Sequence, residues 1–300
     1  MGLTNFPNGV TSFGVPIMGS GQDISGTTYF VDGNSGGDGR DGKSWERAFK
    51  TLAVAFAASH ADIARGSDRW ARRNTIYIAG DSFAEDLIIF PQKTDVIGVG
   101  SFNGQDKGAN ILGNHAPVNA GMGCRFYNVG FESVTAGTIM TLTGSCWGAQ
   151  FNHCEFRAIG TATAVKAIDM TACAAVKIID CDFLGGFSGD VIDIGAGAID
   201  GLVIQNNRIL GGANDGIVVT GTTTKTTGRM GLIDSNTIYV NNITISDGAD
   251  STLVVTNNDC VTVAAYGGTS HVITVEFAAN NYVTANGASY RIPVITDIEV

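Results

Sequence analysis

The chain has 300 residues, of which 44% are hydrophobic and 15% charged, with 41 glycines and five prolines. This composition is apolar enough for a core and too poor in proline for a disordered or collagen-like chain. The net charge is −10, and the longest basic run is Arg72-Arg73, so the chain has no basic patch of the kind that binds nucleic acid. A negative protein is also repelled by anionic membranes, so we expect neither partner.

The first segment, residues 1–28, mixes Gly, Pro and Asn with apolar side chains and is too small to build its own core. Two interpretations stay open: a solvated terminus, or an extended arm that docks on a partner or a neighbouring subunit. We favour the arm, because a solvated tail would carry fewer apolar residues. Its docking residues would be Leu3, Phe6, Pro7, Val10, Phe13, Val15 and Ile17.

Residues 29–74 follow the arm, with an opening strand predicted over 28–32, a polar Gly/Asp loop over 33–42, and a helix. Ser44 is a suitable N-cap, and Trp45, Phe49, Leu52 and Phe56 come after it at helical spacing. Residues 61–73 could form a second helical segment. A solenoid end exposes a core cross-section, so we expect this helix to cap the N-terminal end.

Residues 75–283 alternate short strands with Gly, Asn, Asp or Thr turns, and the first three strands are predicted over 75–80, 86–90 and 95–100. A tail over 284–300 completes the chain, with a strand-like stretch at 291–295. No apolar run approaches the ~18 residues needed to span a bilayer.

A five-residue phrase recurs seven times in this region, at intervals of 22 to 29 residues. It has a small polar residue in second place, Asn or Cys usually in third, and usually an apolar residue in fifth. Such a period predicts a solenoid of stacked β-coils. The phrases begin at Tyr127, Asn152, Ile179, Gln205, Asp234, Thr256 and Ala279.

Stacked coils place equivalent residues one above another. The fifth-place residues Phe131, Phe156 and Phe183 would form an internal column, and Cys154 and Cys181 would lie together as free buried thiols. The third-place asparagines would form a structural hydrogen-bonded ladder, made of Asn207, Asn236, Asn258 and Asn281.

The opening segment resembles that of right-handed parallel β-helix proteins of the pectin-lyase-like type. The resemblance lies in Tyr29-Phe30-Val31-Asp32, the Gly/Asp loop, Trp45, and Ala48-Phe49-Lys50-Thr51-Leu52. Val96-Ile97-Gly98-Val99-Gly100 resembles their first coil. Such openings are common in bacteriophage tailspikes and other virion proteins, and residues 3–10 are similar to N-terminal phrases of phage structural proteins. The resemblance implies an all-β, right-handed parallel β-helix with an N-terminal arm and a capping helix.

Candidate chemistry is dispersed. Glycoside cleavage needs a pair of carboxylates, which could come from Glu132, Glu155 and Asp182, or from Asp190, Asp193, Asp200 and Asp215. We favour the interpretation that these are solvated acidic residues in turns. A β-elimination lyase would use a base among Lys166, Lys177, Arg157 and Arg208. The histidines are scattered: His60, His115, His153 and His271.

In the loop Asp32-x-Asn34-x-Gly36-x-Asp38, the oxygen-bearing side chains are spaced as in calcium-binding loops. We favour instead a turn in which the Asp and Asn side chains hydrogen-bond to nearby backbone N–H groups. We therefore predict no catalytic residue, no metal and no cofactor.

These observations and the resemblance favour a non-enzymatic structural protein of a phage virion. We expect a homotrimeric capsid decoration, or cement, protein on the capsid surface, docked through its arm on the major capsid protein or another virion protein. The alternative is a tailspike or tail fibre protein that binds or degrades host surface polysaccharide.

Overall fold

The computed structural model describes most of the chain. The described residues are 10–12, 15–18, 26–65, 72–79, 82–100, 109–118, 121–133, 135–158, 164–198, 200–220, 231–239, 243–245, 253–260, 282–285 and 288–291.

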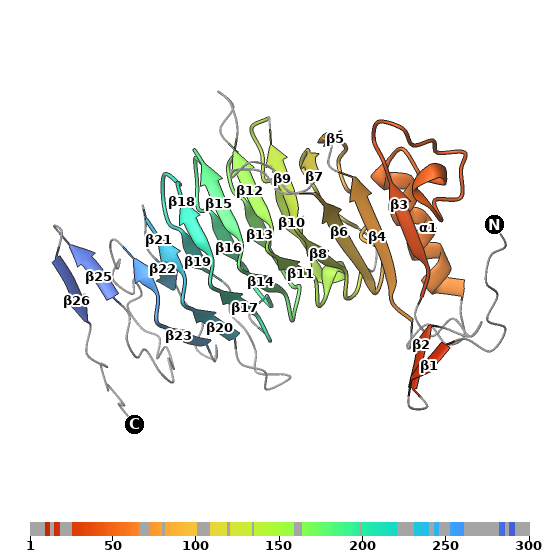
Figure 1. Ribbon diagram of the computed structural model, residues 1–300. Helices are drawn as coiled ribbons and strands as arrows, with labels where there is room; N and C mark the ends of the chain where they lie inside the picture. Colours follow the sequence, from red (N-terminus) through yellow and green to blue (C-terminus); the bar gives the residue numbers. More distant parts are fainter. Residues whose placement is uncertain are drawn as a thin grey trace.

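Three sheets run along the length of a solenoid (Figure 1). The nine-stranded sheet contains β3 (Thr28–Val31), β4 (Asn74–Ala79), β6 (Thr94–Val99), β8 (Arg125–Tyr127), β11 (Gln150–Asn152), β14 (Lys177–Ile179), β17 (Val203–Gln205), β20 (Gly231–Asp234) and β23 (Leu253–Thr256). The five-stranded sheet contains β10 (Met140–Leu142), β13 (Ile168–Met170), β16 (Ile192–Ile194), β19 (Ile217–Val219) and β22 (Ile243–Ile245).

The ten-stranded sheet contains β5 (Ser82–Ala84), β7 (Ala109–Leu112), β9 (Val129–Ser133), β12 (Glu155–Ala158), β15 (Asp182–Gly185), β18 (Arg208–Leu210), β21 (Thr237–Ile238), β24 (Asp259–Cys260), β25 (Tyr282–Ala285) and β26 (Ala288–Arg291). Strands of successive coils pair in parallel, and among the described strands of these three sheets β25 and β26 alone pair antiparallel. The predicted all-β parallel β-helix is confirmed.

The second residue of each phrase makes the turn from the nine-stranded to the ten-stranded sheet. In all six described phrases this residue is left-handed, with φ between 53° and 56°. Asn and Asp tolerate this conformation better than most residues, because their short polar side chains bond locally. The requirement explains the small polar residues in second place: Asn128, His153, Asp180, Asn206, Ser235 and Asn257.

The fifth residue of each phrase points inward and stacks on its equivalent. The ring centroids of Phe131 and Phe156 are 5.1 Å apart, and those of Phe156 and Phe183 are 5.0 Å apart. All three are fully buried, and Ile209 and Ile238 continue the column. The predicted internal column is therefore confirmed. Stacked apolar side chains in equivalent positions form one continuous core.

The third-place asparagines hydrogen-bond from coil to coil. The backbone N–H and Nδ2 of Asn207 both donate to Oδ1 of Asn236, at 3.0 and 2.9 Å, and Asn236 donates to Oδ1 of Asn258 at the same two distances. Each Nδ2 also donates to a backbone carbonyl of the preceding coil, and all three side chains are buried. Asn281 lies outside the described residues.

Cys181 occupies the third place of the phrase before Asn207 and continues the row of asparagines towards the N-terminus. The backbone N–H of Cys181 donates to Oδ1 of Asn207 at 2.9 Å, and its thiol lies 3.4 Å from the Phe151 carbonyl oxygen. Burial, and then its contact with Cys154, raises the pKa of the Cys181 thiol well above its usual value. Both cysteines are free and buried, as the sequence predicted.

A helix covers the N-terminal end, but it begins later than predicted. Ser44 precedes only a 3-10 turn, η1 (Trp45–Arg47), and Phe49 forms a β-bridge with Val31. Helix α1 spans Leu52–Arg65 and lies beside β3 (Figure 1). The first free N–H groups of a helix need acceptors, and those of Leu52 and Ala53 each donate to the Glu85 carboxylate at 2.9 Å.

Other expectations are corrected. The first strand after β4 is β5, at residues 82–84, and not 86–90, whose backbone is irregular. Helix α1 continues to residue 65, so it includes residues 61–65 of the second segment that the sequence allowed, and residues 66–71 lie outside the described residues. Of the strand predicted at 291–295, residue 291 ends β26 and residues 292–295 lie outside the described residues. Within the described ranges, no helix combines the length and apolar character needed to cross a bilayer.

The arm contains a hairpin where an extended strap was expected. Strands β1 (Val10–Ser12) and β2 (Val15–Met18) pair antiparallel and form a two-stranded sheet separate from the solenoid. Val10, Val15 and Ile17 lie in these strands. Four predicted docking residues fall outside the described residues: Leu3, Phe6, Pro7 and Phe13.

Replacing Asn236 with Ala should lower the free energy of unfolding by about 3 kcal/mol, because two buried donors of Asn207 lose their acceptor at about 1–3 kcal/mol each. Urea unfolding of the variant measures the loss. Thr237→Ala, one residue away on the outer surface, is the matched control and should change stability by less than about 0.5 kcal/mol. An unchanged unfolding midpoint for Asn236→Ala would contradict the ladder's contribution.

Candidate functional site

The five-stranded sheet presents a polar row to its outer surface. Its strands bury their first and third residues, so the middle residues point outward, and parallel pairing puts these in register. Asp169 of β13 and Asp193 of β16 are direct Cα partners in this row. The sequence analysis named Asp193 as a candidate but did not name Asp169. The alternation of Ile168, Asp169 and Met170 would have placed Asp169 on the outer face as well.

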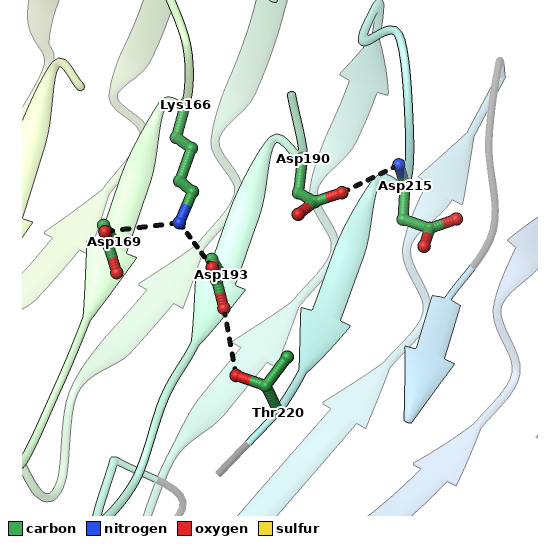
Figure 2. A network of polar contacts seen from close by, with 6 residues as sticks. All are labelled: Lys166, Asp169, Asp190, Asp193, Asp215 and Thr220. Atoms are coloured by element: carbon green, nitrogen blue, oxygen red, sulfur yellow. Dashed lines mark hydrogen bonds and ion pairs between the residues drawn. The ribbon is translucent and has the colours of Figure 1, made fainter. Parts of the chain in front are cut away.

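Lys166 joins the two aspartates (Figure 2). Its Nζ lies 3.3 Å from Asp169 Oδ2 and 2.5 Å from Asp193 Oδ2, and the Thr220 hydroxyl donates to Asp193 Oδ1 at 3.5 Å. Partial burial alone would lower the pKa of the Lys166 ammonium, but the hydrogen bond and charge of Asp193, with Asp169, raise it above its ordinary value.

Asp190 and Asp215 lie beside this network on the next coils (Figure 2). The backbone N–H of Asp215 donates to Asp190 Oδ1 at 3.2 Å. The face therefore carries two carboxylates paired with one ammonium, and two further carboxylates beside them. Ionised carboxylates accept hydrogen bonds from hydroxyl groups and can act as nucleophiles, so this surface suits a hydroxyl-rich ligand.

Glu132, Glu155 and Asp182 lie on the ten-stranded sheet and pair with arginines, whereas Asp200 lies in the turn before β17. Arg157 Nε donates to Glu132 Oε1 at 2.9 Å and lies 3.6 Å from Glu155 Oε1. Both glutamates are about 95% buried, while Asp182 pairs with Arg208 at 2.9 Å. These carboxylates link one coil to the next through ion pairs.

The four candidate bases do not converge. Lys166 projects from the five-stranded sheet, Lys177 from the nine-stranded sheet, and Arg157 and Arg208 from the ten-stranded sheet. The four candidate bases therefore lie on three different faces of the solenoid, and only Lys166 is grouped with several aspartates.

The Gly/Asp loop uses its carboxylates to hold its own backbone. Asp32 Oδ1 accepts from the N–H groups of Asn34 and Ser35 at 2.9 Å, and Asp38 Oδ1 accepts from those of Lys50 and Thr51 at 3.0 Å. Across the described ranges, no group of three or more His, Cys, Asp or Glu side chains is placed to hold a metal ion.

His115 is a buried histidine that sequence reasoning did not single out. Its Nδ1 accepts from the Leu87 N–H at 3.1 Å, and its ring contacts Phe131 with centroids 5.6 Å apart. Burial lowers the pKa of His115 to about 4, against a smaller opposing effect of Asp86. His153, in contrast, is the turn residue that the phrase predicts.

Comparison with known proteins bears on the fold. No protein-family model and no curated protein matches the chain. A crystal structure with a similar fold is that of the pectin methylesterase from Aspergillus niger in deglycosylated form, with 15% identity, a TM-score of 0.45, and coverage of 88% of this chain and 89% of that chain. At this identity the likeness concerns the fold alone.

The prediction that the protein is not an enzyme is corrected at this point. The similar structure is that of an enzyme, so a β-helix of this kind gives no ground for excluding catalysis. The comparison leaves the phage origin, the capsid location and the homotrimer as predictions.

Lowering the pH should destabilise the protein through His115. Its folded pKa of about 4 lies below the unfolded value of 6.5, so the unfolded chain alone binds a proton between these values. The penalty is absent above pH 6.5, grows as the pH falls, and reaches about 3 kcal/mol near pH 4, at about 1.4 kcal/mol per unit of pKa difference. Urea unfolding at pH 7.5 and 4.5 measures it.

His115→Gln, which cannot titrate, should lose that part of the pH dependence. The control His153→Asn removes a turn imidazole that is not part of the core and should keep the wild-type profile. Equal pH profiles for wild type and His115→Gln would rule out this role of the buried imidazole.

Proposed function

We propose that the protein is a structural component of a tailed bacteriophage virion. In this proposal it is a homotrimeric decoration protein on the capsid surface, docked through its N-terminal arm on the major capsid protein or another virion protein. The supporting observation is the arm's own two-stranded sheet, which pairs with none of the three solenoid sheets and lies to the side of the first coils (Figure 1).

The arm and the solenoid have separate physical roles in this proposal. The coils supply rigidity, and α1 closes the N-terminal end of the core whether or not the arm is present. The arm supplies apolar side chains, each worth about 1.5–3 kcal/mol when fully buried, before the cost of ordering the segment. Three arms in one trimer would strengthen attachment through avidity.

Deleting residues 1–25 should abolish binding to virus particles while leaving the solenoid folded. Co-sedimentation with particles that lack this protein measures binding, and circular dichroism monitors the fold. Within the full chain, Phe6→Ser with Phe13→Ser should weaken binding, whereas the matched pair Asn5→Ser with Asn8→Ser should not. Particle binding by the truncated chain would refute docking through the arm.

A second candidate function is supported by the network around Lys166: a tailspike or tail fibre protein that binds or degrades host surface polysaccharide. Asp169 and Asp193 lie on adjacent parallel strands. Such strands are about 4.8 Å apart, which is close to the carboxylate separation of about 5 Å used by retaining glycosidases. The Thr220 hydroxyl and the neighbouring Asp190 add hydrogen-bonding groups for sugar hydroxyls.

For this candidate, the wild-type protein should bind host capsule or clear it in a spot assay. Asp169→Asn with Asp193→Asn should remove that activity, because the double variant retains the size of both side chains and loses both charges. Asp182→Asn, on the ten-stranded sheet, is the control and should remain active. Activity that survives the double substitution would exclude this site.

A further inference from the structure

Two pairs of cysteines occupy equivalent positions in two neighbouring coils. The sequence offset that pairs β11 with β14 also relates Cys154 to Cys181, and it relates Cys146 to Cys173. All four thiols are free and buried. The paired strands β11 and β14 are thus flanked by two thiols at each end, and the two thiol pairs differ in how their sulfur atoms are placed.

Cys154 and Cys181 lie side by side on adjacent coils. The strands that follow them are in register, with Glu155 opposite Asp182, and the Asp182 N–H donates to the Cys154 carbonyl oxygen at 2.9 Å. In-register residues of parallel strands have Cα atoms about 4.8 Å apart. The two thiols also hydrogen-bond to each other. Their sulfur atoms are therefore direct neighbours.

The Cys181 sulfur lies between the two coils. Its thiol is 3.3 Å from the carbonyl oxygen of Ile179 in its own coil and 3.4 Å from that of Phe151 in the coil of Cys154. The Cys154 thiol is 3.4 Å from the Asn152 carbonyl oxygen. A thiol is a weak donor, so these contacts cost little to break when the two sulfur atoms approach each other.

The spacing of the two residues is close to that of a disulfide. The Cα atoms of a disulfide are usually 4.4–6.8 Å apart and its Cβ atoms about 3.5–4.5 Å apart. Side chains of in-register parallel strands leave the backbone in the same direction, so the Cβ atoms of this pair are also about 4.8 Å apart. Closing the bond must draw the two turns together by about 0.5 Å, and the strain makes such a bond easier to reduce.

The second pair is less favourably placed for a bond. Cys146 belongs to η2 (Gly144–Cys146), a 3-10 turn, whereas the coil of Cys173 has no such turn over residues 171–176. The Cys146 thiol lies 3.9 Å from the carbonyl oxygen of Pro117, which belongs to the coil on the side away from Cys173. This pair is therefore an internal comparison for the first, with the same chemistry and burial but a different direction of the sulfur.

We propose that Cys154 and Cys181 form a reversible disulfide bond that cross-links two adjacent coils of the solenoid. The reduced protein, with both thiols free, is the form described above. A peroxide is the oxidant that the step requires. One cysteine sulfur attacks a peroxide oxygen and becomes a sulfenic acid, with release of one water molecule. The partner sulfur then attacks the sulfenic sulfur, the S–S bond forms, and a second water molecule leaves. Two thiols thus lose two electrons and two protons to one hydrogen peroxide.

The pair is reached through the turn from the nine-stranded to the ten-stranded sheet. Each cysteine directly follows an exposed left-handed residue, His153 or Asp180. Short surface turns open locally at a lower cost in free energy than core strands, and hydrogen peroxide is small and uncharged. Burial, and then the contact with Cys154, raises the pKa of the Cys181 thiol, so few thiolates are present at neutral pH and oxidation is slow.

The bond should stabilise the stack of coils. A cross-link between residues far apart in the sequence removes entropy from the unfolded chain, and the strain of the bond offsets part of that gain. Oxidation should therefore lower the equilibrium constant of unfolding by about 10- to 100-fold. Urea unfolding of the oxidised and reduced protein measures the change, and Cys181→Ala should show no change on oxidation.

The inference goes beyond the proposed function. Both candidate functions place the protein in a virion, which passes from a reducing cytosol to an oxidising exterior, so the bond would form after release. Formation of the bond is nevertheless a property of the isolated chain.

The test locates the bond by mass spectrometry of the full-length protein. The folded protein is treated with hydrogen peroxide, the remaining thiols are alkylated in urea, and the chain is cut with trypsin. Cleavage after Lys and Arg leaves Cys146 and Cys154 on peptide 126–157, Cys173 on peptide 167–177, and Cys181 on peptide 178–208. The expected product joins peptides 126–157 and 178–208, has lost two hydrogens, and separates on reduction with dithiothreitol.

Two alanine variants identify the residues that form the bond. Cys154→Ala and Cys181→Ala should each abolish the joined peptide, so either one is sufficient if the other fails to fold. Cys173→Ala, which replaces another buried cysteine of the same coil, is the matched control and should still form it. Far-UV circular dichroism monitors the fold of each variant.

Three results would overturn the proposal. The first is folded wild-type protein that yields no joined peptide after peroxide treatment, and the second is a joined peptide that persists in Cys181→Ala. The third is a bond between peptides 126–157 and 167–177 alone, which would assign the cross-link to Cys146 and Cys173.

This test is independent of docking on particles. If the bond forms while the arm deletion leaves particle binding intact, arm docking fails and the cross-link stands. If no bond forms while the arm deletion abolishes particle binding, the proposed function stands and this inference fails.

Discussion

Strands of the solenoid hydrogen-bond to their equivalents in the neighbouring coils, with Cα partners in register in all three sheets. The remaining structure depends on this constraint, because in-register coils force each residue to lie on its counterpart from the preceding coil. Inward positions must then share one shape, which the stacked rings of Phe131, Phe156 and Phe183 do. Outward positions line up into rows, so residues far apart in the sequence come to lie side by side on each face.

Stacking also decides which polar groups can be buried. An asparagine in third place is tolerated because the next coil supplies an identical partner: Asn236 accepts two hydrogen bonds from Asn207 and donates two to Asn258. Cys181 ends this row by donating its N–H to Asn207. His115 lies in the core without a counterpart of its own kind, and its Nε2 has no hydrogen-bond partner in the described part of the chain. Its low pKa is the electrostatic consequence of burial.

The three outer faces differ in ways that separate possible functions. The five-stranded sheet carries an acidic network around Lys166 that suits a hydroxyl-rich ligand, and the ten-stranded sheet carries ion pairs between coils. The nine-stranded sheet carries mixed apolar and polar side chains and two buried donors without acceptors among the residues described. A capped solenoid with a separate N-terminal hairpin thus presents chemically different surfaces on its three sheets and at its end.

The repeat, and the features that it imposes, could be predicted from residue type and spacing. The period of 22 to 29 residues, the polar second place and the apolar fifth place were enough to predict a solenoid of stacked β-coils, its internal aromatic column and the free stacked cysteines. The resemblance of the opening segment to pectin-lyase-like proteins implied that the solenoid is a parallel β-helix. These features are local or strictly periodic, so residue type and spacing carry them. The helix start at Leu52 was not local, because it depends on Glu85, a residue 33 positions away in sequence. Likewise, the partnership of Asp169 with Asp193 and Lys166 required the tertiary structure. The phrase marks one turn of each coil, but the lengths of the other turns vary, and those lengths decide which residues share a face.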